Sequence, residues 1–294
     1  MKNIQIKNRD NETITINNWH ISDARAVLII AHGASEHINR YEELAKFLNN
    51  GKVEVYGYNH KGHGPERKHK DKIVIAESNG DEKLVNDLED VCLYAYSHNS
   101  KLPLYVLGHS MGSLITRVLM METKISFNGV ILTGTLNPSS NLIRSAKAIG
   151  LVNKKIFGSK KISPKLNKLV FGDLKERISY NSDNINEYIL DEDSGIPFSN
   201  SAIDDLLKLT VKAIDENNIA NMQKSNYLFM SGKDDAFSDN TKQLYELVDI
   251  MDKYNINNEY HFYHGMKHEI LNEEDNIEVY VDILNFIKET SGHN

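Results

Sequence analysis

Five consecutive residues, Gly108-His109-Ser110-Met111-Gly112, have the types and spacing to position a nucleophile. They follow a strand-like run, PLYVL, and precede a helix-like run, SLITRVLM. A serine on a sharp turn between a strand and a helix projects its hydroxyl from the edge of a sheet, and the two glycines leave room for the crowded backbone. The start of the following helix offers N–H groups to a developing oxyanion. The pattern therefore predicts nucleophilic acyl transfer by Ser110.

A nucleophilic serine requires a base, and the base requires a carboxylate that orients it. Two loops that follow strand-like runs offer such groups. The first contains Asp234 and Asp235, and the second contains His264 and His268. The residue types alone do not decide which of the two acids and which of the two histidines would serve Ser110.

Strand-like and helix-like segments alternate along the first half of the chain. Alternating apolar and polar residues at 4–6 and 13–16 predict two antiparallel strands. A continuous apolar run, typical of a strand buried on both faces, occurs at Ala26–Ala31, and further strand-like segments occur at Val53–Tyr58, Leu102–Leu107 and Val130–Thr133. Helical spacing occurs between them, at Tyr41–Leu48, Leu84–Tyr96 and Met111–Met121. This order predicts an α/β fold with a mainly parallel sheet.

The alternation stops between about Ser139 and Asn221, where helical periodicity continues without a convincing buried strand. It resumes with strands at Tyr227–Met230 and Glu259–Tyr263 and with helices at Thr241–Tyr254 and Ile277–Ile287. We therefore expect a core formed by residues 1–138 and 222–294. Residues 139–221 would form a helical insertion, here called the cap.

Four segments resemble those of the α/β-hydrolases in the monoacylglycerol lipase and lysophospholipase group, which is also grouped with serine aminopeptidase-like hydrolases. Two positions, Asn59 and Lys61, differ from that group, which usually has Asp and Arg there. The segments span most of the chain in the same order, and they are GHSMG (108–112), HGASEH with RY (32–37 and 40–41), NHKGHG (59–64) and YHGMKHEILNE (263–273).

The resemblance implies an α/β-hydrolase fold, with a mainly parallel central sheet flanked by helices and an inserted helical cap. Its G-x-x-D and G-x-x-H-E spacings select Asp235 and His268 as the partners of Ser110. It places the oxyanion hole at the backbone N–H groups of Ala34 and Met111. The implied reaction is hydrolysis of a carboxylic ester through an acyl-enzyme, with a monoacylglycerol or lysophospholipid as substrate and without a cofactor.

Other functions share these residue patterns. A short-chain carboxylesterase, a thioesterase or an aminopeptidase would use the same serine chemistry. A small-molecule receptor on a hydrolase fold is an alternative from another class. The chain has twelve histidines, including the pair His60 and His63, but no HExxH motif. We therefore expect these loop histidines to bond backbone carbonyls rather than a metal.

The composition limits partners and location. A net charge of −7 argues against a nucleic-acid partner. The single cysteine, Cys92, excludes an intramolecular disulfide, and its apolar surroundings predict a buried side chain. The first twelve residues contain no apolar segment of a signal peptide, so we expect a cytoplasmic protein.

The cap begins with a strongly basic segment. Ten lysines and arginines between Ser139 and Arg177 face only Asp173 and Glu176, a local balance of +8, and apolar residues lie between them. Such a segment forms either an ordinary solvated lid or a surface that docks on anionic lipid. The composition leaves both open.

Overall fold

The computed structural model describes residues 1–292, and of residues 140, 142, 152 and 153 it describes the backbone alone. Within this part of the chain, eight strands form one sheet in the order β1-β2-β4-β3-β5-β6-β7-β8. The first two strands pair antiparallel and β2 runs antiparallel to β4, whereas all other neighbours are parallel. The strands are β1 (Lys2–Lys7), β2 (Thr13–Trp19), β3 (Ala26–Ala31), β4 (Val53–Tyr58), β5 (Leu104–His109), β6 (Gly129–Thr133), β7 (Asn226–Gly232) and β8 (Asn258–Tyr263).

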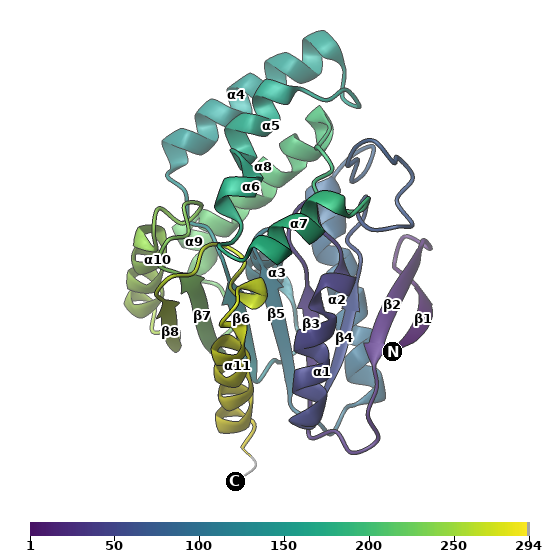
Figure 1. Ribbon diagram of the computed structural model, residues 1–294, viewed down its shortest axis with the longest axis vertical. Coiled ribbons are helices and arrows are strands. Elements are labelled where there is room, and N and C mark those ends of the chain that lie inside the picture. The colour runs from purple at the N-terminus through teal and green to yellow at the C-terminus, as the bar shows by residue number, and fades with distance from the viewer. Residues whose placement is uncertain (293–294) are drawn as a thin grey trace.

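Helices cover both faces of this sheet (Figure 1). One face packs against α1 (Glu42–Asn50) and α11 (Asn276–Thr290), and the other packs against α2 (Gly80–His98), α3 (Met111–Glu122) and α10 (Lys242–Lys253). All residues of β3, β4, β5 and β6 are buried, which explains why these strands are mainly apolar. The α/β fold predicted from the sequence is thereby confirmed.

The segment between β6 and β7 is helical in the part of the chain that the structure describes. Its longer helices lie beyond the carboxyl ends of the parallel strands, at the top of Figure 1. The helix α8 packs against α4 on one side and against α2 and α3 on the other. The segment comprises α4 (Ser140–Phe157), α5 (Pro164–Phe171), α6 (Leu174–Arg177), α7 (Ser182–Leu190), α8 (Asn200–Ile214) and α9 (Glu216–Ile219). Because α8 contacts both parts, the limits of the cap at residues 139 and 221 stay a prediction.

A buried arginine on α3 joins this segment to the core. Arg117 is fully buried, and its guanidinium donates hydrogen bonds to the carbonyls of Leu136, at 2.7 Å, and Ala213, at 2.6 Å. Burial lowers the pKa of Arg117 to about 9. The Arg117 side chain thus binds both the segment that follows β6 and the end of α8.

Some elements differ from the sequence-based boundaries. The strand β5 begins after Pro103 and continues to His109, next to the serine. The helix α2 begins at Gly80, four residues before the predicted start. Its first turn is polar and so lacks the apolar spacing used for the prediction, and Asp81 in that turn is buried and paired with Lys212 of α8. Cys92 is buried as expected. None of the helices described in residues 1–292 combines the length and apolarity needed to cross a bilayer.

Candidate active site

Ser110 lies on the turn between β5 and α3, as the sequence predicts. Its backbone has φ 52° and ψ −116°, a conformation that residues other than glycine rarely adopt. The N–H of Ser110 donates to the carbonyl of Thr133, at 3.0 Å, which fixes the turn against β6. A Cβ on Gly112 would lie 2.0 Å from the carbonyl oxygen of Ala31, so only glycine lets α3 approach β3 this closely.

The structure brings together the three side chains selected from the sequence. His268 Nε2 lies 2.9 Å from Ser110 Oγ, and His268 Nδ1 lies 3.0 Å from Asp235 Oδ2. The three residues follow β5, β7 and β8, and the carboxyl ends of parallel neighbours meet at one edge of the sheet. Hydrogen bonds thus link hydroxyl, imidazole and carboxylate.

The two candidate acids have different surroundings. Asp235 is fully buried, and its Oδ1 accepts a 2.9 Å hydrogen bond from the N–H of Phe237. Asp234 is exposed and accepts a 3.3 Å hydrogen bond from the hydroxyl of Tyr180. Of the two, Asp235 is the one in contact with His268. The other candidate base, His264, is exposed beside Lys233, at 2.8 Å.

Burial and charge act in opposite directions on the His268–Asp235 pair. Burial lowers the pKa of His268, but the Asp235 carboxylate outweighs this effect and the net pKa is raised. Burial likewise raises the pKa of Asp235, but the imidazole and the Phe237 N–H outweigh it and the net pKa is lowered. The carboxylate therefore stays ionised and favours the imidazolium that forms when His268 accepts a proton.

The two residues selected for their backbone N–H groups lie beside Ser110. Ala34 and Met111 both line the cavity at the serine. Met111 is the first residue of α3, so its N–H has no acceptor one turn earlier in the helix. His109 is buried next to them, and its Nδ1 lies 3.0 Å from Thr133 Oγ1. Burial lowers the pKa of His109 to about 3, which keeps this second imidazole neutral.

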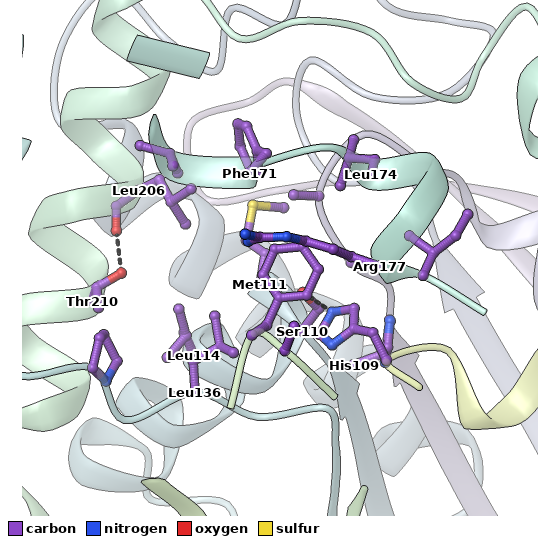
Figure 2. A pocket seen from close by; sticks show the side chains of 18 of the residues that line it. His109, Ser110, Met111, Leu114, Leu136, Phe171, Leu174, Arg177, Leu206 and Thr210 are labelled. Atoms are coloured by element: carbon purple, nitrogen blue, oxygen red, sulfur yellow. Dashed lines mark hydrogen bonds between the residues drawn. The ribbon is translucent and has the colours of Figure 1, made fainter. Parts of the chain in front are cut away.

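A cavity of about 260 Å³ opens above Ser110. Figure 2 shows Ser110 and His109 at its base, with apolar side chains from several helices around it. Its lining is mostly apolar and includes Leu114, Leu136, Ile143, Leu169, Phe171, Leu206 and Leu207, which belong largely to α3, α4, α5 and α8. The helices between β6 and β7 therefore cover the serine and supply most of the apolar wall.

A buried ionic network lies on the other side of the cavity, and sequence reasoning did not find it. Arg40 donates to Glu269 at 3.0 Å and 2.7 Å and to Glu36 at 3.0 Å. Asn184 of α7 contacts both Arg40, at 2.7 Å, and Glu269, at 2.9 Å. Glu36 also accepts hydrogen bonds from the N–H of Gly33 and from Tyr41. The network joins the loop after β3, helix α7 and the loop that carries His268.

Three histidines of the early loops bond the backbone. His60 Nε2 lies 3.0 Å from the carbonyl of His32, and the N–H of His60 donates to His32 Nε2 at 2.9 Å. His63 Nδ1 lies 3.2 Å from the carbonyl of Lys61. Burial lowers the pKa of His60 to about 3, so the ring is neutral and packs on its neighbours. These contacts shape the loop that holds Ala34.

The architecture defines the class of protein. A mainly parallel sheet with a serine on the strand-to-helix turn after a central strand is the arrangement of the α/β-hydrolases. A solved structure of a soluble variant of monoglyceride lipase from Saccharomyces cerevisiae, in complex with a substrate analog, shares this fold. Its TM-score is 0.82, with 20% sequence identity, over 100% of this chain and 96% of that chain.

Sequence comparisons give the family. A monoglyceride lipase homolog from Monkeypox virus is 27% identical over 276 residues, which cover 92% of this chain and 91% of the viral protein. A monoglyceride lipase from Rattus norvegicus is 30% identical over 150 residues, or 50% of this chain and 48% of the rat protein. Residues 22–275 match the model of the serine aminopeptidase S33 family of hydrolases. The chain belongs to this family, and it is a serine ester hydrolase.

Proposed function

We propose that the protein hydrolyses single-chain lipid esters, with Ser110, His268 and Asp235 as its catalytic triad. The observation that carries this proposal is the hydrogen-bonded series from Ser110 Oγ through His268 to Asp235, at the base of a mainly apolar cavity. A serine so placed attacks an acyl carbonyl, and an apolar cavity accommodates the acyl chain.

The geometry supports one sequence of steps. His268 takes the proton of Ser110 as the oxygen attacks the carbonyl carbon, and the N–H groups of Ala34 and Met111 stabilise the oxyanion. The alcohol then leaves with the proton from His268. Water attacks the acyl-enzyme with His268 again as base, and the acid is released. Asp235 keeps the imidazole oriented throughout.

The cavity and the relatives together favour a monoacylglycerol or a lysophospholipid. A cavity of about 260 Å³ suits one acyl chain. The relatives reported above are named for monoglyceride hydrolysis. An aminopeptidase would need a free carboxylate for the substrate ammonium, but the two acids that line the cavity, Glu36 and Glu269, are both bonded to Arg40.

We also propose that the cap touches anionic membrane surfaces while the enzyme collects its substrate. The end of α4 exposes Leu151, Ile156 and Phe157, with 57%, 66% and 61% of their surface accessible. Lys155 and Lys161 are exposed beside them. Apolar side chains can enter the acyl boundary while lysines meet anionic head groups.

A substrate panel tests the proposed reaction. We expect the purified protein to hydrolyse esters of glycerol with graded acyl length, and to prefer chains longer than acetyl because the cavity wall is apolar. A thioester and an amino-acid amide with the same acyl or apolar group serve as comparison substrates. Faster cleavage of the amide than of every ester would contradict the proposal.

A further inference from the structure

One cation reaches into the otherwise mainly apolar cavity. Arg177 closes the short helix α6 and lines the cavity above Ser110. Its side chain extends inward from α6, and its nitrogen atoms lie over the middle of the cavity in Figure 2. The guanidinium carbon lies 5.4 Å from the centre of the Phe237 ring. The sequence analysis counted Arg177 among the ten basic residues of the cap, but in the fold it lines the cavity.

No carboxylate among the described side chains forms an ion pair or hydrogen bond with Arg177. The two acids in the cavity lining, Glu36 and Glu269, are held by Arg40. A guanidinium carries five N–H donors, and Arg177 is only partly buried, so a ligand in the cavity can reach them. The position therefore holds donors and positive charge available to a ligand.

The backbone around Arg177 keeps the guanidinium in this place. Gly172 has φ +67°, and a Cβ there would lie 2.4 Å from the guanidinium carbon, so the group packs directly on the turn between α5 and α6. The next residue, Ile178, accepts a 2.7 Å hydrogen bond at its carbonyl from the N–H of Glu269, which follows His268. The position of Arg177 is thus tied to the loop of the proposed catalytic base.

The same contacts indicate which end of the substrate Arg177 meets. The Phe237 ring is near both groups: its centre lies 5.4 Å from the guanidinium carbon of Arg177 and 4.5 Å from the centre of the His268 ring. The leaving alcohol takes its proton from His268, so it must occupy the part of the cavity beside that imidazole. The acyl chain then lies against the apolar residues that α3, α4, α5 and α8 contribute to the cavity.

We propose that Arg177 binds an anionic group on the alcohol part of the substrate, so that the preferred ester is one of an acidic alcohol such as a glycerol phosphate. This inference rests on the proposed ester hydrolysis, whose substrate class it narrows. Arginine binds phosphate or carboxylate through two parallel N–H donors. A lysophospholipid with an exposed phosphate fits this chemistry better than a neutral monoacylglycerol.

Three esters with the same acyl chain separate the possibilities: monodecanoyl glycerol, decanoyl glycerol phosphate and decanoyl glycerate. They are neutral, phosphate-bearing and carboxylate-bearing. We expect Arg177→Met to raise the KM for the anionic esters about tenfold or more, as for loss of a charged hydrogen bond, and to leave the neutral ester within about twofold. Arg177→Lys should restore part of the loss, because it keeps the charge without the paired donors.

A control variant lies on the same helix. Lys175 is exposed on α6, so Lys175→Met removes one positive charge without reaching the cavity. It should leave the ratio between anionic and neutral esters unchanged. An effect on the phosphate ester alone would assign the site to phosphate, and an effect on both anionic esters would assign it to anions in general. Equal losses for all three esters, or no change with Arg177→Met, would overturn the inference.

Binding without turnover separates this inference from the proposed reaction. Decyl phosphate and decanol can be titrated calorimetrically into Ser110→Ala, with and without Arg177→Met. Arg177→Met should weaken the binding of decyl phosphate about tenfold and should change the binding of decanol little. If no ester is hydrolysed but this difference persists, the proposed reaction fails while the anion site stands. If the difference is absent, the anion site fails whatever the protein hydrolyses.

Discussion

Arg40 donates two hydrogen bonds to Glu269, the residue that follows His268, at 3.0 Å and 2.7 Å. Little of either side chain is exposed: 11% for Arg40 and 6% for Glu269. Burial raises the pKa of the Glu269 carboxyl, but Arg40 outweighs this and lowers it to about 2. The ion pair between Arg40 and Glu269 therefore joins the segment after β3 to the loop that carries His268.

We expect Arg40→Met to destabilise the protein by about 3–5 kcal/mol, because it leaves Glu269 and Glu36 buried without their cation. Chemical denaturation measures this as a loss in the free energy of unfolding. Arg9→Met is the matched control, since Arg9 pairs with Glu89 and Asp90 on the surface, where such pairs contribute up to about 1 kcal/mol. Equal losses of unfolding free energy in the two variants would show that burial does not increase the contribution of the Arg40 network to stability.

Ser110→Ala should abolish ester hydrolysis while the protein keeps its thermal unfolding temperature, since the hydroxyl contacts only His268 in the site described above. A fluorophosphonate probe should label the wild type at Ser110 and leave the variant unlabelled. Mass spectrometry of the labelled peptide checks the position. Near wild-type turnover by Ser110→Ala would remove the basis of the proposed mechanism.

The acid can be tested with two adjacent variants. Asp235→Asn should lower kcat by a factor on the order of 10⁴, because it removes the carboxylate that holds the imidazole. Asp234→Asn should have little effect, because Asp234 is exposed and bonds only to Tyr180 among the side chains reported above. Steady-state kinetics with one ester decides between them, and the opposite ranking would reassign the acid.

The pH dependence follows from the direction of the shift at His268. The base acts in its neutral form, and its pKa is raised above the ordinary value of 6.5. We therefore expect the acid limb of kcat/KM to have its midpoint above 6.5. Asp235→Asn removes the main raising influence while burial remains, so the residual activity should show a midpoint shifted to lower pH. A midpoint that does not move would mean that another group controls the limb.

The cap surface can be tested with vesicles. Lys154 and Lys160 are paired with Asp204 and Glu77, so they are poor choices for charge reversal. A variant with Lys155→Glu, Lys161→Glu and Phe157→Ser should lose its preference for anionic over zwitterionic vesicles in co-sedimentation. The wild-type preference should fall with added salt.

The control for the cap places Glu at Lys101 and Lys124. Both lysines are exposed before β5 and β6, at the opposite end of the sheet. This variant should bind vesicles like the wild type, and both variants should cleave a short soluble ester. Equal pelleting of the wild type with neutral and anionic vesicles would leave the cap as a solvated lid.

The strands and the serine turn could be predicted because their signals are local. Mainly apolar runs indicated β3 to β6, and the two glycines indicated the turn around Ser110. The choice of Asp235 over Asp234 depended on spacing shared with relatives, since both are acids in one loop. The structure brings Ser110, Asp235 and His268 together, and their roles remain the proposal above.

The parts that sequence reasoning missed depend on long-range contacts. Arg40 and Glu269 are 229 residues apart, and nothing in either local pattern indicates the other. Arg177 appeared as one of ten basic residues, and its place in the cavity, with the guanidinium packed on Gly172, is visible only in the fold. Arg117 is a charged residue within a mainly apolar helical sequence. That position was the one sign in the sequence that it has a specific buried partner.

Arg117 also ties the two connections of the inserted segment to the core. Its guanidinium holds the carbonyls of Leu136 and Ala213, at the entry and near the exit of the inserted segment. Separating these two connections would leave a buried guanidinium without acceptors, at a high free-energy cost. The arginine thus acts as a fixed point: an opening of the cavity that keeps both hydrogen bonds leaves the start of the inserted segment and the end of α8 on the core.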